Sequence, residues 1–140
     1  MTEALVLADT GPLVAMLSPS DIHHESCVEA AKKIAPPLLT SWPVIAEAAW
    51  LLRGRPMAVD HLLDLIEIGA IEVLDLDKEA VKQTRRILNR YRSLGPQLVD
   101  ATLVYLAERE KIETIFTLDR RDFRVYRTRR GRAFRLVPEM

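Results

Sequence analysis

The 140-residue sequence lacks the features of disulfide-bonded, secreted and membrane-spanning proteins. Its only cysteine, Cys27, excludes an internal disulfide and favours a reducing compartment. No run of 18 apolar residues is present, so no segment predicts a transmembrane helix. The apolar start of the chain also lacks the basic flank of a signal peptide. We therefore expect a cytoplasmic protein that has no membrane partner.

Several motifs of common catalytic sites are missing as well. The chain contains no Gly-x-Gly-x-x-Gly fingerprint and no P-loop, so a nucleotide cofactor has no support. It contains no Gly-x-Ser-x-Gly elbow for a serine nucleophile and no Cys/His cluster with the spacing of a zinc site. Any chemistry must therefore come from other residue types.

The chain has no excess of charge of either sign, because 20 Lys and Arg residues balance 20 Asp and Glu residues. A net charge of zero argues against a protein that coats nucleic acid by bulk charge. The arginines are nevertheless grouped, between residues 85 and 92 and more densely between residues 120 and 135. Each group alone is typical of a solvated charged face, although the planar Arg fork also suits phosphate.

Short apolar runs alternate with amphipathic helical segments along the chain, which is typical of an α/β domain with a central parallel sheet. The segment 97–109 is almost wholly apolar and predicts a central helix, whereas Arg135 predicts that the last strand lies at a sheet edge. No repeat or linker interrupts the pattern, so we expect one domain over residues 1–140. The apolar runs predict strands at residues 4–8, 38–41, 71–76, 113–118 and 133–137.

Capping residues and prolines place the boundaries of the predicted helices. Ser20 or Asp21 begins the second helix, Ser41 caps the third and Asp77 caps the fifth, while Pro56 stops the third. The predicted helices cover residues 11–18, 21–35, 43–52, 57–68, 78–91 and 97–109.

The first apolar run ends abruptly at Asp9, which is followed by Thr10 and a Gly-Pro turn. Ligands of open α/β sheets bind just outside the carboxyl ends of the strands, where this prediction places Asp9. The alternative is that Asp9 is only the N-cap of the next helix, because Asp is a good N-cap residue. The two interpretations do not exclude each other.

Three further acids share this placement. Asp119 ends the fourth apolar run, and Glu47 and Asp100 lie on apolar helix faces near helix N-termini. Strand carboxyl ends and the N-termini of the following helices lie on one edge of a parallel sheet, so the four acids can converge. Asp100 also has a purely structural explanation in the helix dipole, and Glu47 in a position at the edge of the core.

Converging carboxylates repel one another, by roughly 4 kcal/mol for a pair about 4 Å apart at an effective dielectric constant near 20. Protonation relieves this repulsion, and so does a divalent cation, for which oxygen-only ligands favour Mg²⁺ or Mn²⁺. Such a metal site serves phosphodiester hydrolysis. The arginine groups then become candidates for holding a nucleic-acid backbone, in particular Arg85, Arg86, Arg120 and Arg121.

Four motifs, in this order and spacing, resemble the PIN-domain family and, within it, the VapC-type toxins of bacterial and archaeal toxin–antitoxin pairs. Each motif is loose alone, but together they extend over essentially the whole chain. They are Asp9-Thr10-Gly11-Pro12-Leu13, Ser41-Trp42-Pro43-Val44-Ile45-Ala46-Glu47, Asp100-Ala101 and Thr117-Leu118-Asp119-Arg120-Arg121-Asp122-Phe123.

The resemblance implies a five-stranded parallel sheet flanked by helices and an Mg²⁺-dependent endoribonuclease, with Mn²⁺ as an alternative metal. Asp9, Glu47, Asp100 and Asp119 correspond to the acidic quartet of the family, whose members bind the metal and carry the catalysis. The quartet is intact in this chain, so the resemblance does not point to an inactive member.

The resemblance also implies roles for neighbouring residues and for partners. Thr10 would help to place metal, water or phosphate, and Thr117 would support Asp119 through hydrogen bonds. Asp122 would support the metal ligands or cap a helix. Members of the family typically form homodimers and are neutralised by a small antitoxin protein that covers the site.

Two other functions remain open from the sequence. One is a PIN-domain nuclease that acts in RNA processing or decay without an antitoxin. The other is a non-catalytic module that binds RNA or protein and whose acids are structural.

Overall fold

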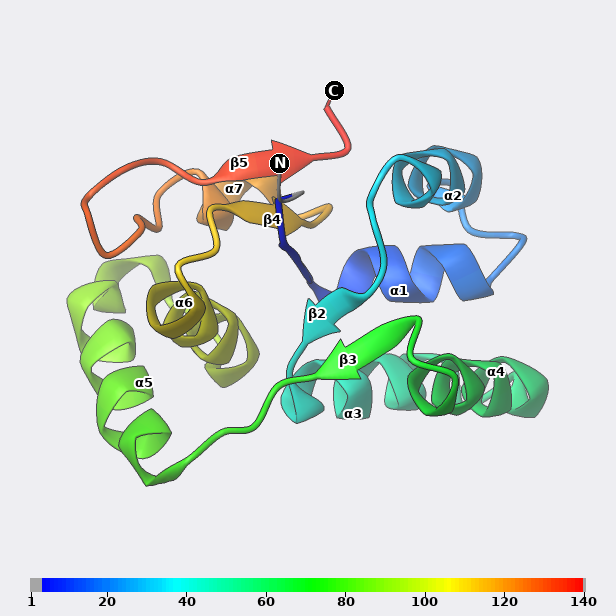
Figure 1. Cartoon of the computed structure of the whole chain (residues 1–140), viewed down its shortest axis with the longest axis horizontal. Coiled ribbons are helices and arrows are strands. Elements are labelled where there is room, and N and C mark those ends of the chain that lie inside the picture. Colours follow the sequence, from blue (N-terminus) through cyan, green and yellow to red (C-terminus); the bar gives the residue numbers. More distant parts are fainter. Residues whose placement is uncertain (1–3, 140) are drawn as a thin grey trace.

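A five-stranded sheet forms the centre of the computed structural model, which describes residues 4–139 (Figure 1). All strand pairings are parallel and the strand order is β3-β2-β1-β4-β5, with β1 at the centre and β5 at an edge. The α/β architecture expected from the sequence is thereby confirmed. The strands are β1 (Val6–Ala8), β2 (Leu38–Thr40), β3 (Ile71–Val73), β4 (Thr114–Phe116) and β5 (Arg135–Val137).

The helices lie in two groups around the sheet. Figure 1 shows α1 to α4 on one side and α5 and α6 on the other, and the groups meet where α3 contacts α6. Each helix among the described residues is too short or too polar to cross a membrane. The helices are α1 (Thr10–Leu17), α2 (His24–Lys32), α3 (Trp42–Leu51), α4 (Pro56–Glu67), α5 (Lys78–Arg90), the 3₁₀-helix η1 (Arg92–Leu94), α6 (Leu98–Glu110) and α7 (Arg120–Phe123).

The core forms around the two central strands and α6. Leu7 of β1 lies opposite Ile115 of β4, and both side chains are fully buried. Every residue of α6 from Asp100 to Ala107 is buried, which confirms that the nearly all-apolar segment forms a central helix. Because this buried run begins at an acid, the N-terminus of α6 brings a carboxylate to the carboxyl edge of the sheet.

A side-chain cap begins α3, which carries Glu47, and the capping residue also contacts α6, which carries Asp100. Ser41 caps α3 as expected, accepting the Val44 N–H at 3.4 Å. The same hydroxyl hydrogen-bonds to the Thr102 hydroxyl of α6 at 2.9 Å, in a buried contact. This contact ties α3, which carries Glu47, to α6, which carries Asp100.

Several expected boundaries are wrong for local reasons. α2 begins at His24 rather than at Ser20 or Asp21, because the Asp21 carboxylate accepts the His23 N–H and forms a turn instead. Pro56 begins α4 rather than stopping α3, at a helix position that needs no N–H donor. The third strand ends at Val73, three residues earlier than its apolar run predicts.

The sequence pattern also gave no prediction for α7. This four-residue helix starts directly after β4 and is capped by Asp119, whose carboxylate accepts the Asp122 N–H at 3.2 Å. One turn is too short to show helical periodicity. The consequence for the site is that Asp119 and Asp122 lie within the same turn of backbone.

Candidate active site

An acid-lined pocket of about 380 Å³ lies at the carboxyl edge of the sheet. It receives residues from the ends of β1 and β4 and from the start of α6, together with residues of α3 and α7. The four acids selected from the sequence all line it. Its lining comprises Asp9, Thr10, Gly11, Glu47, Leu51, Gly95, Gln97, Asp100, Leu118, Asp119 and Asp122.

Asp9 enters the pocket from the central strand and is 7% exposed. One carboxylate oxygen accepts the Thr10 N–H and the other accepts the Thr117 hydroxyl, each at 2.8 Å. Burial, the largest cause, and the charges of Asp119 and Glu47 together raise the pKa of Asp9 to about 6, against the lowering effect of the two hydrogen bonds. Asp9 thus occupies the N-cap position of α1 and also faces other acids, so both sequence interpretations apply to it.

Asp100 enters from the first turn of α6 and is 8% exposed. Burial raises its pKa to about 7, and the charges of Asp9, Asp119 and Asp122 contribute to the increase. The Tyr126 hydroxyl donates a hydrogen bond to Asp100 Oδ2 at 3.1 Å, which acts in the opposite direction. Burial is thus the main cause of the raised pKa of Asp100, and the repulsion inferred from sequence adds to it.

Asp100, Asp119 and Asp122 form the tightest group of acids. One carboxylate oxygen from each lies within 4.8 Å of the other two. Burial and the charge of Asp119 raise the pKa of Asp122. Glu47, on α3, is half-buried and lines the same pocket without joining this group.

Thr117 connects two of the acids through a single hydroxyl. Its Oγ1 donates to Asp9 and accepts the backbone N–H of Asp119 at 2.9 Å. The side chain is fully buried. The relative position of the ends of β1 and β4 is thereby set by a hydrogen bond in addition to the strand pairing.

The donors around the pocket suit a divalent cation that prefers oxygen. The acids supply carboxylate oxygens, and the described part of the pocket offers no cysteine or histidine. The Thr10 Oγ1 atom is buried and has no hydrogen-bond partner, which is uncommon for a buried hydroxyl. A bound cation would supply the missing positive charge. A water molecule on that cation, or a phosphate oxygen, would supply the missing partner of the Thr10 hydroxyl.

Tyr126 was not anticipated from the sequence. It is fully buried, and its ring makes edge-on contacts with Tyr91 and Phe123 at centroid distances of 5.0 and 5.1 Å. A signal was present, because an aromatic residue three positions after Phe123 inside an arginine-rich stretch indicates a buried anchor. Its contact with Asp100 depends on the tertiary fold.

The four arginines selected for RNA contact lie outside the lining of the acidic pocket. Arg86 forms an ion pair with Glu108 of α6, and Arg120 donates to the Pro138 carbonyl at 2.6 Å. Arg85 and Arg121 are exposed.

A parallel α/β sheet with an oxygen-only acidic pocket at its carboxyl edge fits the class of α/β proteins that bind a divalent cation there. Comparison with known proteins identifies the family. The model of the PIN domain family matches residues 6–128. Ribonuclease VapC26 of Mycobacterium tuberculosis is 31% identical over 135 residues, which span 95% of this chain and 100% of that protein. The chain belongs to the PIN domain family.

Solved structures share the fold at lower sequence identity. VapC20 of Mycobacterium tuberculosis, described as a Sarcin-Ricin loop cleaving toxin, has a TM-score of 0.72 at 20% identity and covers 79% of this chain and 86% of its own. A toxin–antitoxin complex from Klebsiella pneumoniae scores 0.65 at 15% identity, covering 84% and 89%. VapBC2 from Rickettsia felis, bound to a DNA fragment from its promoter, scores 0.62 at 16% identity, covering 94% and 96%.

The raised pKa values predict that the metal-free protein loses stability as the pH rises. The pKa values of folded Asp9 and Asp100, about 6 and about 7, lie above the ordinary value of 3.8, so the folded state binds these protons more tightly than the unfolded state. Their stabilising contribution is fully present below pH 3.8 and is lost as the pH passes through 6 to 7. Thermal unfolding in EDTA, at pH values from about 4 to about 8, measures this loss.

Asp9→Asn and Asp100→Asn should each flatten this pH dependence and raise the Tm at pH 8 in EDTA by about 5 °C. Asp64→Asn, an exposed change on α4, is the matched control and should leave the curve unchanged. A large loss of Tm in both pocket variants at every pH would show that these acids act mainly as structural caps.

Proposed function

We propose that this protein is a VapC-type PIN-domain endoribonuclease, acting as a single domain over residues 1–140, and that it hydrolyses RNA phosphodiester bonds in the acidic pocket. The observation that carries the proposal is the convergence of four acids in one pocket at the carboxyl edge of the sheet, where Asp9 and Asp100 are buried and Glu47 and Asp119 are half-buried. The named ribonuclease relative, which aligns over nearly the whole chain, supports the same activity.

The metal of this site is Mg²⁺, with Mn²⁺ as the alternative, and Asp9, Glu47, Asp100 and Asp119 are its ligands. One carboxylate oxygen of Asp122 lies within 4.8 Å of one from Asp100 and one from Asp119, so Asp122 is a further candidate ligand. When bound, the metal activates water and offsets the negative charge of the transition state.

The chain's own groups hold these ligands and the substrate. The Thr117 hydroxyl orients Asp9, and its acceptor lone pair fixes the backbone of Asp119. The Thr10 hydroxyl, which has no protein partner, is free to donate to a phosphate oxygen or to the attacking water. The half-buried Glu47 lines the same pocket from α3.

Cleavage of a structured RNA in the presence of Mg²⁺ or Mn²⁺ tests the proposal. EDTA should abolish the activity, and Asp9→Asn or Asp100→Asn should lower it by on the order of 100-fold, because each variant removes a ligand charge. Asp64→Asn should retain wild-type activity. Cleavage that survives both EDTA and Asp9→Asn would contradict a metal site, and absence of cleavage on every RNA would favour the non-catalytic binding module.

The biological role that we propose is that of the toxin in a type II toxin–antitoxin pair, with a small antitoxin protein and a second copy of the chain as partners. The structural relative from Klebsiella pneumoniae is described as a toxin–antitoxin complex, and the one from Rickettsia felis is described as VapBC2. The negative pocket suits a basic antitoxin side chain that takes the place of the metal. We also propose a cytoplasmic location, where such an RNA substrate would be met.

Expression of the chain alone should arrest growth, and co-expression with the small reading frame directly upstream of its gene should restore it. Asp100→Asn, which removes a pocket charge, should abolish the arrest and serves as the control. Light scattering after size-exclusion chromatography should give twice the mass of the chain. Absence of arrest, combined with RNA cleavage in vitro, would instead assign the nuclease to RNA processing or decay.

Tyr126→Phe should weaken Mn²⁺ binding by about tenfold, because it removes the hydroxyl that orients Asp100 and keeps the ring packing. Tyr105→Phe is the matched control, since its hydroxyl makes a similar bond, at 3.0 Å, to Asp77 outside the pocket. Calorimetric titration with Mn²⁺ should separate the two variants even where their Tm values fall alike. Equal Mn²⁺ affinity in both would show that Tyr126 has only a structural role.

A further inference from the structure

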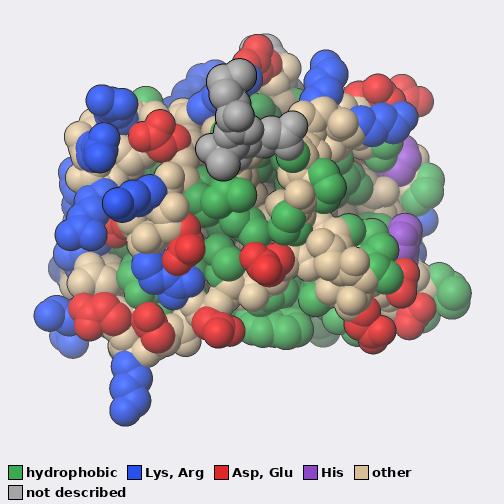
Figure 2. Space-filling view, in the orientation of Figure 1, with side chains coloured by type: hydrophobic (Ala, Val, Ile, Leu, Met, Phe, Trp, Pro, Cys, Tyr) green, Lys and Arg blue, Asp and Glu red, His purple; other side chains and the backbone are tan. Residues whose placement is uncertain are grey.

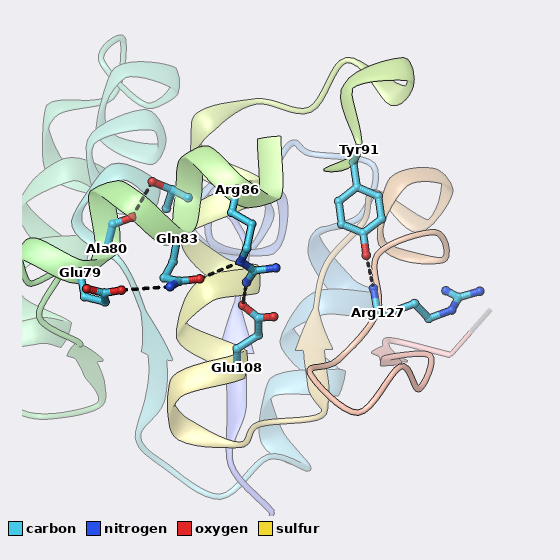
Figure 3. Close-up of polar contacts among 8 residues, drawn as sticks. Glu79, Ala80, Gln83, Arg86, Tyr91, Glu108 and Arg127 are labelled. Atoms are coloured by element: carbon cyan, nitrogen blue, oxygen red, sulfur yellow. Dashed lines mark hydrogen bonds and ion pairs between the residues drawn. The ribbon is translucent and has the colours of Figure 1, made fainter. Parts of the chain in front are cut away.

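Positive charge is concentrated in one region of a protein whose net charge is zero. Residues 78–94 contain six Lys or Arg side chains and one acid, and residues 123–138 contain six Arg side chains and no acid. The two segments are neighbours, because the Tyr91 hydroxyl accepts the Arg127 N–H at 3.1 Å (Figure 3). Figure 2 shows blue side chains gathered at the left, over α5 and the segment that leads to β5. Self-repulsion in such a region is relieved by an anionic partner.

A groove of about 480 Å³ lies within this basic region and is larger than the acidic pocket. Four arginines from three elements line it: Arg86 and Arg90 of α5, Arg109 of α6, and Arg129 of the segment before β5. Tyr105 is the one aromatic side chain in its described lining, and the remaining lining residues are polar or charged. A groove without an apolar floor suits a polyanion better than the apolar face of a protein helix.

The two acids in the groove are already engaged (Figure 3). Glu79 accepts a hydrogen bond from the Gln83 amide at 3.0 Å, and Gln83 in turn accepts one from Arg86 at 2.7 Å. Arg86 then pairs with Glu108. Arg109 is also paired, with Glu110 at 2.7 Å. Glu108 is thus neutralised by Arg86, and Glu79 is held by the neutral Gln83 amide, without using Arg90 or Arg129.

Arg90 and Arg129 are exposed, and neither forms an ion pair with a carboxylate within residues 4–139. The Arg90 guanidinium lies 5.3 Å from the centroid of the Tyr91 ring, and this cation–π contact restricts the orientations of the Arg90 side chain. Two unpaired guanidiniums facing one groove from different elements form a fork for phosphate oxygens.

We propose that this groove binds the phosphodiester backbone of the RNA substrate outside the catalytic pocket, with Arg90 and Arg129 as the phosphate contacts. The proposal rests on the proposed ribonuclease function and deepens it by naming where the flanking nucleotides bind. It differs from the sequence prediction for Arg86, whose charge is taken up by Glu108.

A short chain of contacts joins the groove to the catalytic pocket. Arg90 is followed by Tyr91, whose ring contacts Tyr126, and the Tyr126 hydroxyl donates to Asp100. All the linking side chains are buried or half-buried. A strand of RNA held by Arg90 is thereby placed in fixed relation to the acids that cleave it.

Fluorescence anisotropy with two labelled single-stranded RNA oligonucleotides of unrelated sequence, in EDTA, tests the groove. The double variant Arg90→Gln/Arg129→Gln should bind both RNAs about tenfold more weakly at low salt. It should also reduce the slope of log Kd against log salt by about 1.4, because each phosphate contact to a single strand contributes about 0.7. With Mg²⁺ present, the same variant should raise the KM for RNA cleavage.

Arg53→Gln/Arg55→Gln removes two exposed arginines between α3 and α4 and is the control for net charge. It should leave the Kd, the salt slope and the KM close to those of the wild type. Equal weakening in both double variants would overturn the proposal, since binding would then follow overall charge. An unchanged Kd and KM in the groove variant would overturn it as well.

A ten-residue poly-glutamate peptide distinguishes RNA from an acidic protein segment. Peptide binding that matches the RNA in affinity, and that is lost in Arg90→Gln/Arg129→Gln, would assign the groove to protein and overturn the proposal. Failure of the proposed function has a separate signature, because the wild-type protein would then cleave no RNA with Mg²⁺ or Mn²⁺ in any of these assays.

Discussion

The structure depends on a concentration of negative charge that the fold itself does not relieve. Five carboxyl groups line one pocket of about 380 Å³, and burial raises the pKa values of Asp9 and Asp100 to about 6 and about 7. A domain of this size is only marginally stable, so such repulsion survives where it serves a function. The divalent cation proposed above would account for the acids, for the burial of Asp9 and Asp100 and for the unpartnered Thr10 hydroxyl.

Hydroxyl groups keep these acids in place without neutralising them. Thr117 and Tyr126 donate to Asp9 and Asp100, and both donors are fully buried. A basic partner in either position would form an ion pair and compete with the metal for the carboxylate. A neutral donor instead orients one oxygen and leaves the negative charge available. The hydrogen bond between the Ser41 and Thr102 hydroxyls joins the helices that carry Glu47 and Asp100, and so helps to fix the distance between these two acids.

The neutral total charge conceals a separation of charge within the molecule. Acids gather at the carboxyl edge of the sheet, while α5 and the segment from residue 123 to residue 138 carry most of the unpaired arginines. Both regions border α6, which contributes Asp100 to one and Arg109 to the other. One helix thus lies between the acidic pocket and the arginine-lined groove. In the proposed function, the groove would hold the phosphate backbone of an RNA while the acidic pocket holds the metal ion at the bond that is cleaved.

The sequence alone determined the parallel sheet with its last strand at an edge, the central position of α6, and the acids at the ends of apolar runs. This was possible because apolar runs that alternate with helical segments indicate a parallel sheet. In such a sheet the carboxyl ends of the strands lie at one edge, whatever the details of packing. Tertiary structure alone decided that the Asp122 carboxylate lies close to those of Asp100 and Asp119. It also decided that the Tyr126 hydroxyl donates to Asp100, and that Arg86 forms an ion pair with Glu108. Each of these contacts joins residues whose approach depends on a one-turn helix, a chain reversal or a helix crossing. Such features leave no periodic signal in the sequence, because short-range patterns record which face a residue occupies and not which distant side chain it meets.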